Sequence, residues 1–223
     1  MLRHSTGRLV ILTLLGLLVF SAAALAAPPP WTPPGRSLGQ QVWWAMFDLE
    51  QGTTYTYDLE ALNRNRVSVR GQLSFTPLAD GTIRFWYDVG AISGHGTAPA
   101  DPQALAGAVL LSAVSQAGRA NVETLQALAA PFYWVNWLDQ LYNARFRNGI
   151  VWEEFTSPPT RFEAQQTWPF GTAYEGKFTV GRETVARMWL DLWEPLPERI
   201  VVFDGRWEFS AQLTSAPQGP LLR

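Results

Sequence analysis

Hydrophobic and polar residues alternate along two long stretches of the chain, and this alternation predicts β-strands. In the first stretch, Val67–Phe75 and Ile83–Val89 alternate on both sides of Asp80-Gly81, a pair typical of hairpin turns. Gln41–Leu49, which is apolar on both faces, and Tyr55–Leu59 bring the strands expected before residue 93 to four.

The second stretch predicts five more strands after residue 160. They cover residues 161–168, 174–180, 182–193, 199–203 and 207–213, and Asp204-Gly205 is the turn before the last of them. The total is about nine strands. Apart from Gln41–Leu49, each has one apolar and one polar face, as in an antiparallel sheet with one face in water.

Between the two stretches the apolar period becomes helical. Asp101-Pro102 is an N-cap followed by proline at the first helical position, and it predicts a helix over 104–115. A second helix is expected to begin at Asn121, and a third over Phe132–Arg147. The predicted fold class is α+β: a curved antiparallel sheet, or half-barrel, covered by a helical block at about residues 102–147.

The start of the chain predicts export. Met1–Arg8 carries two cations, Leu9–Phe20 is apolar, and small residues follow, so residues 1–26 form a signal peptide with cleavage expected after Ala26. The alternative is an uncleaved membrane anchor, because Leu9–Ala27 approaches the roughly 20 residues that span a bilayer.

The remaining chain is expected to be one extracytoplasmic domain, periplasmic or secreted. Residues 27–40 form a proline-rich tether, 41–214 the single α+β domain and 215–223 a loose tail. Loss of Arg3 and Arg8 with the signal peptide takes the net charge from −2 to −4, which gives nucleic-acid binding little electrostatic support.

Composition and spacing exclude several kinds of chemistry. The chain has no cysteine, so a thiol nucleophile is excluded and stability depends on packing rather than disulfides. His95 is the one histidine of the mature chain, and its flanking glycines predict a surface loop; the alternative is a catalytic or metal-binding role. Neither a metal site nor a cofactor is expected.

The carboxylates also do not predict a catalytic pair. Glu153 and Glu154 are adjacent, so on a strand they point to opposite faces. Asp88 and Asp191 lie near Trp86 and Trp189, as in the cleft of a sugar hydrolase, yet both acids are expected on the polar faces of their strands. We assign no catalytic residue from the sequence.

Tryptophan is abundant, with 11 in the chain, and two groups could form a site. A ligand pocket under the helical block is expected to be lined by Trp134, Trp137, Leu141, Phe85 and Phe209; the alternative is that they only fill the core, as expected of Trp168 and Trp207. Trp86 and Trp189 fall on polar faces and are expected to form a surface interaction site.

The closing segments resemble a known family. Met188–Asp191, Pro195–Ile200 and Asp204–Phe209 are similar to the last strands of the envelope lipoprotein-carrier-like proteins, the LolA/LolB-like half-barrels. This resemblance, which covers about residues 188–213, implies an extracytoplasmic half-barrel that holds an acyl chain or another apolar ligand between sheet and lid.

We therefore interpret the chain as an exported, non-enzymatic envelope protein that binds a lipid or another apolar small molecule between sheet and helical lid. One alternative is a structural or protein-interaction module with a partner in the envelope. A second is an aromatic-lined domain that binds or hydrolyses glycans.

Overall fold

The computed structural model describes residues 41–116, 121–167 and 171–215. The predicted signal peptide, the whole of the predicted tether, Trp168 and the predicted tail beyond residue 215 lie outside these residues. The elements are β1 (Tyr55–Asn63), β2 (Arg66–Pro77), β3 (Thr82–Val89), β4 (Ile92–Pro99), α2 (Pro102–Val114), α3 (Val122–Ala129), the 3-10 helix η1 (Ala130–Trp137), α4 (Leu138–Asn143), β5 (Gly149–Glu154), β6 (Thr160–Gln166), β7 (Ala173–Val180), β8 (Glu183–Asp191), β9 (Arg199–Asp204) and β10 (Trp207–Ser215).

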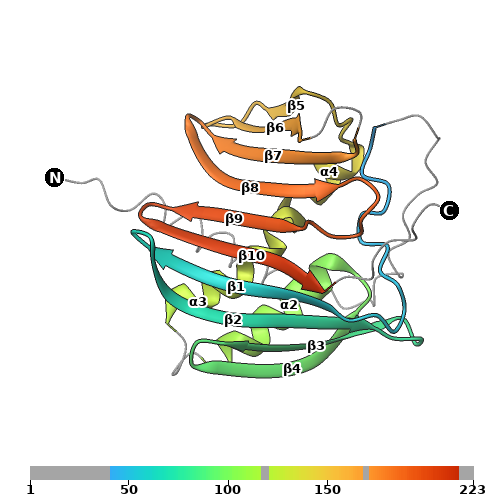
Figure 1. The fold of residues 1–223 in the computed structure, drawn as a ribbon, viewed down its shortest axis with the longest axis vertical. Helices are drawn as coiled ribbons and strands as arrows, with labels where there is room; N and C mark the ends of the chain where they lie inside the picture. The colour runs from blue at the N-terminus through green and yellow to red at the C-terminus, as the bar shows by residue number, and fades with distance from the viewer. Residues whose placement is uncertain (1–40, 117–120, 168–170, 216–223) are drawn as a thin grey trace.

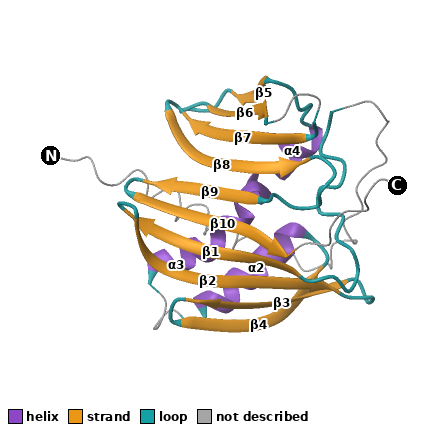
Figure 2. Cartoon of the chain, in the orientation of Figure 1, coloured by secondary structure: helices purple, strands orange, loops and turns teal. Residues whose placement is uncertain are grey.

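All ten strands belong to one antiparallel sheet in the order β4-β3-β2-β1-β10-β9-β8-β7-β6-β5. Two meanders, β1–β4 and β5–β10, join where β1 pairs with β10. The chain between β4 and β5 passes along one face of the sheet as the helical block (Figures 1 and 2). The predicted α+β half-barrel with its helical block is confirmed, with ten strands in place of about nine.

The alternation of the sequence produces two unlike faces of the sheet. On β3, Ile83, Phe85, Tyr87 and Val89 are buried on the inner face toward the helices, whereas Arg84, Trp86 and Asp88 are exposed on the outer face. A one-residue shift of register would expose every apolar side chain of a strand, so burial of the inner face fixes the register.

Glycines on the inner face make room for aromatic rings of the neighbouring strand. Gly96 of β4 pairs with Phe85 of β3, and a Cβ atom at Gly96 would lie 2.7 Å from the Phe85 ring. At Gly176 of β7, a Cβ atom would overlap the ring of Phe162 on β6. The rings therefore cover the surface that the missing side chains leave open.

The first two predicted helix starts are confirmed. The Ala104 backbone N–H donates to Asp101 Oδ1 over 2.7 Å, and the Thr124 N–H donates to Asn121 Oδ1 over 2.8 Å, so both caps satisfy a free backbone donor.

The third predicted helix, over 132–147, is wrong in form. Residues 130–137 form a 3-10 helix, and α4 ends at Asn143 because Ala144 is extended. Trp137 leaves the helical conformation at the junction, with φ −117° and ψ 22°, which separates the apolar stripe into two short elements.

The predicted strand over 41–49 is also wrong. This segment is a series of turns in which the Trp44 and Ala45 backbone N–H groups donate to the Leu192 carbonyl. It is apolar on both sides because it is enclosed: the Trp43 and Trp134 rings lie 5.3 Å apart, and the Trp43 indole N–H donates to the Glu194 carbonyl over 2.7 Å.

Two strands were not predicted, β4 and β5. β4 contains His95, so this histidine lies on a strand rather than in a loop. Gly94 and Gly96 read as loop residues in the sequence, but in the sheet they accommodate Tyr87 and Phe85. Among the described residues, no helix is long and apolar enough to cross a membrane.

The turn between β8 and β9 joins distant parts of the chain. The Tyr57 hydroxyl, whose pKa burial raises, donates to the Pro197 carbonyl over 2.7 Å, and the Phe47 N–H donates to the Pro195 carbonyl over 2.8 Å. Burial, together with the charges of Asp191 and Glu198, raises the pKa of the Glu194 carboxyl in the same turn.

We predict that Gly176→Ala lowers the free energy of unfolding by about 1–3 kcal/mol, because the new methyl group overpacks the Phe162 ring. Gly107→Ala is the matched control. A Cβ atom there meets no heavy atom within 4 Å, so this change in α2 should be neutral or stabilise by up to about 1 kcal/mol. Urea unfolding measures both values, and equal effects of the two variants would contradict the packing role of Gly176.

We predict that Glu194→Gln stabilises the protein more at pH 7 than at about pH 3. A raised pKa means that stability is present while the carboxyl is protonated and is lost as pH rises through the titration of Glu194. Glutamine cannot ionise and removes this loss. Thermal unfolding of both proteins across this range measures the difference, and a gain confined to acid pH would contradict it.

Candidate functional site

The five residues predicted to line a pocket lie on the inner face of the sheet or in the helical block. Four of them, Trp134, Leu141, Phe85 and Phe209, are at most 3% exposed, and only Trp137 is half-buried. The Trp134 ring packs against Trp43, and Phe209 stacks on Trp207. In the structure, the protein's own side chains fill the interior at these four positions.

Trp137 instead belongs to an aromatic cluster at the far end of the block, which we call the lid seam: Tyr133, Trp137, Trp152 and Phe178. The Trp137 ring lies 5.3 Å from that of Trp152 and 6.1 Å from that of Phe178, and Tyr133 meets Phe178 edge-on at 5.6 Å. Trp137 and Trp152 are both half-buried. Here the helical block meets β5 and β7 with part of its aromatic surface accessible to solvent.

Few polar groups occur in the lid seam. Burial raises the pKa of the Tyr133 hydroxyl to about 12, so it is uncharged at neutral pH. The Trp152 indole N–H is buried without a hydrogen-bond partner among the described residues. At the border of the seam, Gln140 Nε2 of α4 donates to Glu154 Oε1 of β5 over 2.6 Å, which ties block and sheet together.

Sequence reasoning missed Trp152 as a site residue. Finding it would have required the recognition of β5 as a strand in the sequence. The register of β5 shifts between Ile150 and Trp152, and this irregularity interrupts the alternation of apolar and polar residues. Without that strand, the side of the sheet on which Trp152 lies could not be assigned.

The two tryptophans predicted to form a surface site lie on the outer face, with four strands between them. Trp86 on β3 is 44% exposed. Trp189 on β8 is half-buried, and the Arg199 guanidinium lies 5.1 Å from the centre of its ring. Five strand spacings correspond to about 24 Å, so the two residues do not form one contiguous patch.

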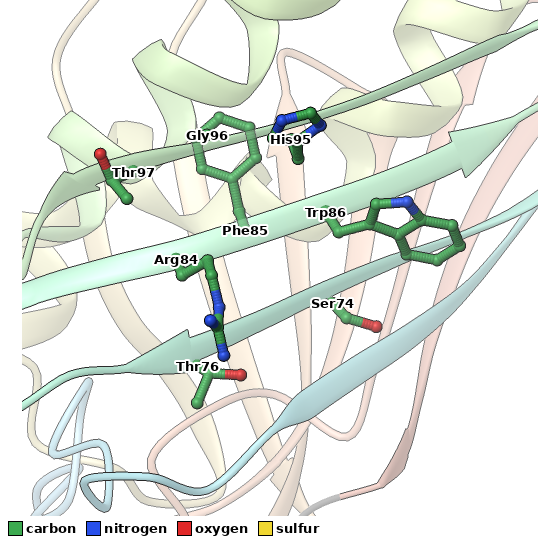
Figure 3. A pocket seen from close by; sticks show the side chains of 8 residues that line it. All are labelled: Ser74, Thr76, Arg84, Phe85, Trp86, His95, Gly96 and Thr97. Carbon is green, nitrogen blue, oxygen red and sulfur yellow. The ribbon is translucent and has the colours of Figure 1, made fainter.

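Two hollows flank Trp86 on the outer face. The first, of about 390 Å³, is lined by Ser74, Thr76, Arg84, Phe85, Trp86, His95, Gly96 and Thr97 (Figure 3). The second, of about 540 Å³, is lined by Asp58, Leu59, Glu60, Arg70, Gly71, Gln72, Trp86, Asp88 and Gly90. Neither hollow includes a residue of the helical block.

The polar candidates of the sequence do not converge on a catalytic centre. Asp88 lies on β3 and Asp191 on β8, much further apart than the roughly 5–9.5 Å between the carboxylates of glycosidases. Asp191 accepts hydrogen bonds from the Thr172 hydroxyl and the Trp193 N–H, and so orders the turn after β8. Within the described ranges, no three His, Cys, Asp or Glu side chains are grouped to hold a metal ion.

The fold and these surfaces define an α+β half-barrel with an aromatic seam under its helical block and a tryptophan between two hollows on its outer face. No protein-family model and no curated protein matches the chain. Among solved structures, it is similar to a domain from Vibrio parahaemolyticus provisionally described as an outer membrane lipoprotein-sorting protein domain. The TM-score is 0.22, the identity 8%, and the match covers 75% of this chain and 86% of that one.

We predict that Gln140→Ala loosens α4 without unfolding the sheet, because it removes the hydrogen bond to Glu154. The expected result is faster amide hydrogen exchange over 138–143 and a loss of stability of about 1 kcal/mol. Gln165→Ala, on the exposed outer side of β6, is the control and should leave exchange in α4 unchanged. If the amide exchange rates over 138–143 are equal in the two variants, the hydrogen bond between Gln140 and Glu154 does not hold α4 against the sheet.

Proposed function

We propose that this chain is an exported, non-enzymatic protein of the cell envelope that binds an apolar or amphipathic ligand, most simply a lipid, between the sheet and the helical block. The ligand enters at the lid seam. The observation that carries the proposal is the half-buried Trp137–Trp152 pair beside Phe178, where apolar surface of the concave side remains accessible. Trp137 stacks on the Phe178 ring, and Trp152 meets that ring edge-on.

Burial of this remaining aromatic surface supplies the driving force. Each methylene group that an acyl chain removes from water contributes about 0.8 kcal/mol, so a chain of several carbons lying against the seam gives useful affinity. The unpartnered Trp152 N–H can donate to an oxygen of the ligand, and the neutral Tyr133 hydroxyl adds no charge that would repel an acyl chain.

The helical block ends in two weakly stabilised elements, η1 and α4, and this supports the idea that a ligand can displace them. η1 is a 3-10 helix of 8 residues with no side-chain cap, longer than the 3–4 residues at which such helices usually stop, and α4 has only 6 residues. Because Trp134 and Leu141 already fill the interior, a ligand must move chain atoms, and moving Trp137 costs less than moving the fully buried Trp134.

The decisive experiment joins native mass spectrometry of protein purified from its own envelope to titration with a fluorescent fatty acid. We predict a bound lipid mass on the native protein. The double variant Trp137→Ala, Trp152→Ala should bind the fatty acid about tenfold more weakly, because most of the accessible seam is removed.

Trp86→Ala is the matched control, since it removes one tryptophan from the opposite face of the sheet. It should bind the fatty acid as the wild type does. Protein that carries no lipid and does not respond to the fatty acid would overturn the proposal, as would an equal loss of binding in the control.

A further inference from the structure

We propose that the outer face of β2–β4 holds a second binding site, separate from the lid seam, for a saccharide that carries a carboxylate. The site is the pair of hollows that flank Trp86, and its occupant stacks a sugar ring on the indole. It does not depend on lipid binding, because its residues lie on the face of the sheet turned away from the helical block.

Trp86 has the features of a stacking platform. It is 44% exposed on a strand face whose other residues, Arg84 and Asp88, are polar. The residues directly opposite on the neighbouring strands are Ser74 and His95, so small or polar groups surround the flat ring. The axial C–H groups on one side of a pyranose ring pack on such a surface, because the aromatic face is electron-rich and apolar.

Trp189, the other tryptophan predicted on the outer face, differs from Trp86 because an arginine covers its ring. It also lies on the outer face, yet the Arg199 guanidinium lies over its ring at 5.1 Å and it is half-buried. No cation–π contact of this kind covers Trp86 among the described residues.

The two hollows differ in charge, which sets the class of ligand. On the first side, Arg84 and His95 face the hollow, and neither makes an ion pair with a described residue. Figure 3 shows Arg84 extending from β3 toward Thr76 of β2. A carboxylate placed here gains the charge-assisted hydrogen bonds that Arg84 otherwise gives to water.

On the second side, two of the acids already have partners. Arg70 Nε pairs with Glu60 Oε1 at 2.9 Å, and Gln72 Nε2 donates to Asp58 Oδ1 over 2.8 Å. Together with Asp88, these acids offer carboxylate acceptors that suit hydroxyl donors of a further sugar. The arrangement therefore accepts a carboxylate on one side of the indole and neutral hydroxyls on the other.

The hydroxyl side chains around Trp86 favour a saccharide over an acidic peptide. Ser74 shares a hydrogen bond of 2.9 Å with Thr56, and Thr76 shares one of 2.8 Å with Thr54, so their positions are fixed before a ligand arrives. Both volumes, about 390 and 540 Å³, lie within the range of about 300–1,000 Å³ typical of small-molecule sites. Groups held on paired strands need little ordering on binding.

Isothermal titration calorimetry of the mature protein tests the site with three probes: a disaccharide of one glucuronic acid and one glucose, the neutral disaccharide of glucose, and polyglutamate of six residues. We expect the acidic sugar to bind more tightly than both others. Trp86→Ala should weaken it about tenfold. Arg84→Gln should reduce the preference for the acidic over the neutral disaccharide, while the neutral disaccharide binds as before.

Trp189→Ala is the matched control and should bind the acidic disaccharide as the wild type does. Circular dichroism confirms that each variant is folded. The proposal is overturned if the acidic disaccharide does not bind, if polyglutamate binds equally well, or if Trp189→Ala loses as much affinity as Trp86→Ala. Because Trp86→Ala leaves the lid seam intact, failure here is distinguishable from failure of fatty-acid binding.

Discussion

One constraint governs this fold: a sheet of ten strands has a continuous apolar face that must be kept from water. The helical block covers it, and the segment before β1 completes the cover, with Trp43 packed against Trp134 at 5.3 Å. The Trp43 indole N–H donates to the Glu194 carbonyl in the turn after β8, so one residue joins the segment before β1, the helical block and the closing strands. Loss of this junction would expose the middle of the inner face.

Glycine on the inner face links the packing of the core to the outer surface. The Phe85 ring occupies the space over Gly96, which keeps the core closed at a position that has no side chain. Both residues also border the first hollow from the strands beneath it, while the next residue, Trp86, points outward. Alternation along β3 thus places a core anchor and an exposed platform on consecutive residues.

The sequence was informative wherever a pattern is local. Period-two alternation predicted the exposure of Trp86, and the N-caps Asp101 and Asn121 were correct because a cap depends on three or four neighbouring residues. β4 was not predicted because its two glycines are typical of a loop in the sequence. Their reason is the packing of two aromatic rings of β3 over them, which only the structure shows. The hollows could not be predicted either, since they require the register that brings Ser74 and His95 to the two sides of Trp86.

The two proposed sites lie on opposite faces of the same sheet, and a different factor limits the affinity of each. Under the block, a ligand must displace chain atoms, so affinity is limited by the cost of moving η1 and α4. On the outer face, paired strands hold Trp86 and Arg84, so affinity depends on how well a ligand fits groups that do not move. Because the strands between the faces are fixed by their ladders, a ligand on one face has no moving element through which to change the other. The two binding events should therefore be independent, so the protein should bind the acidic disaccharide with the same affinity whether or not a fatty acid is bound.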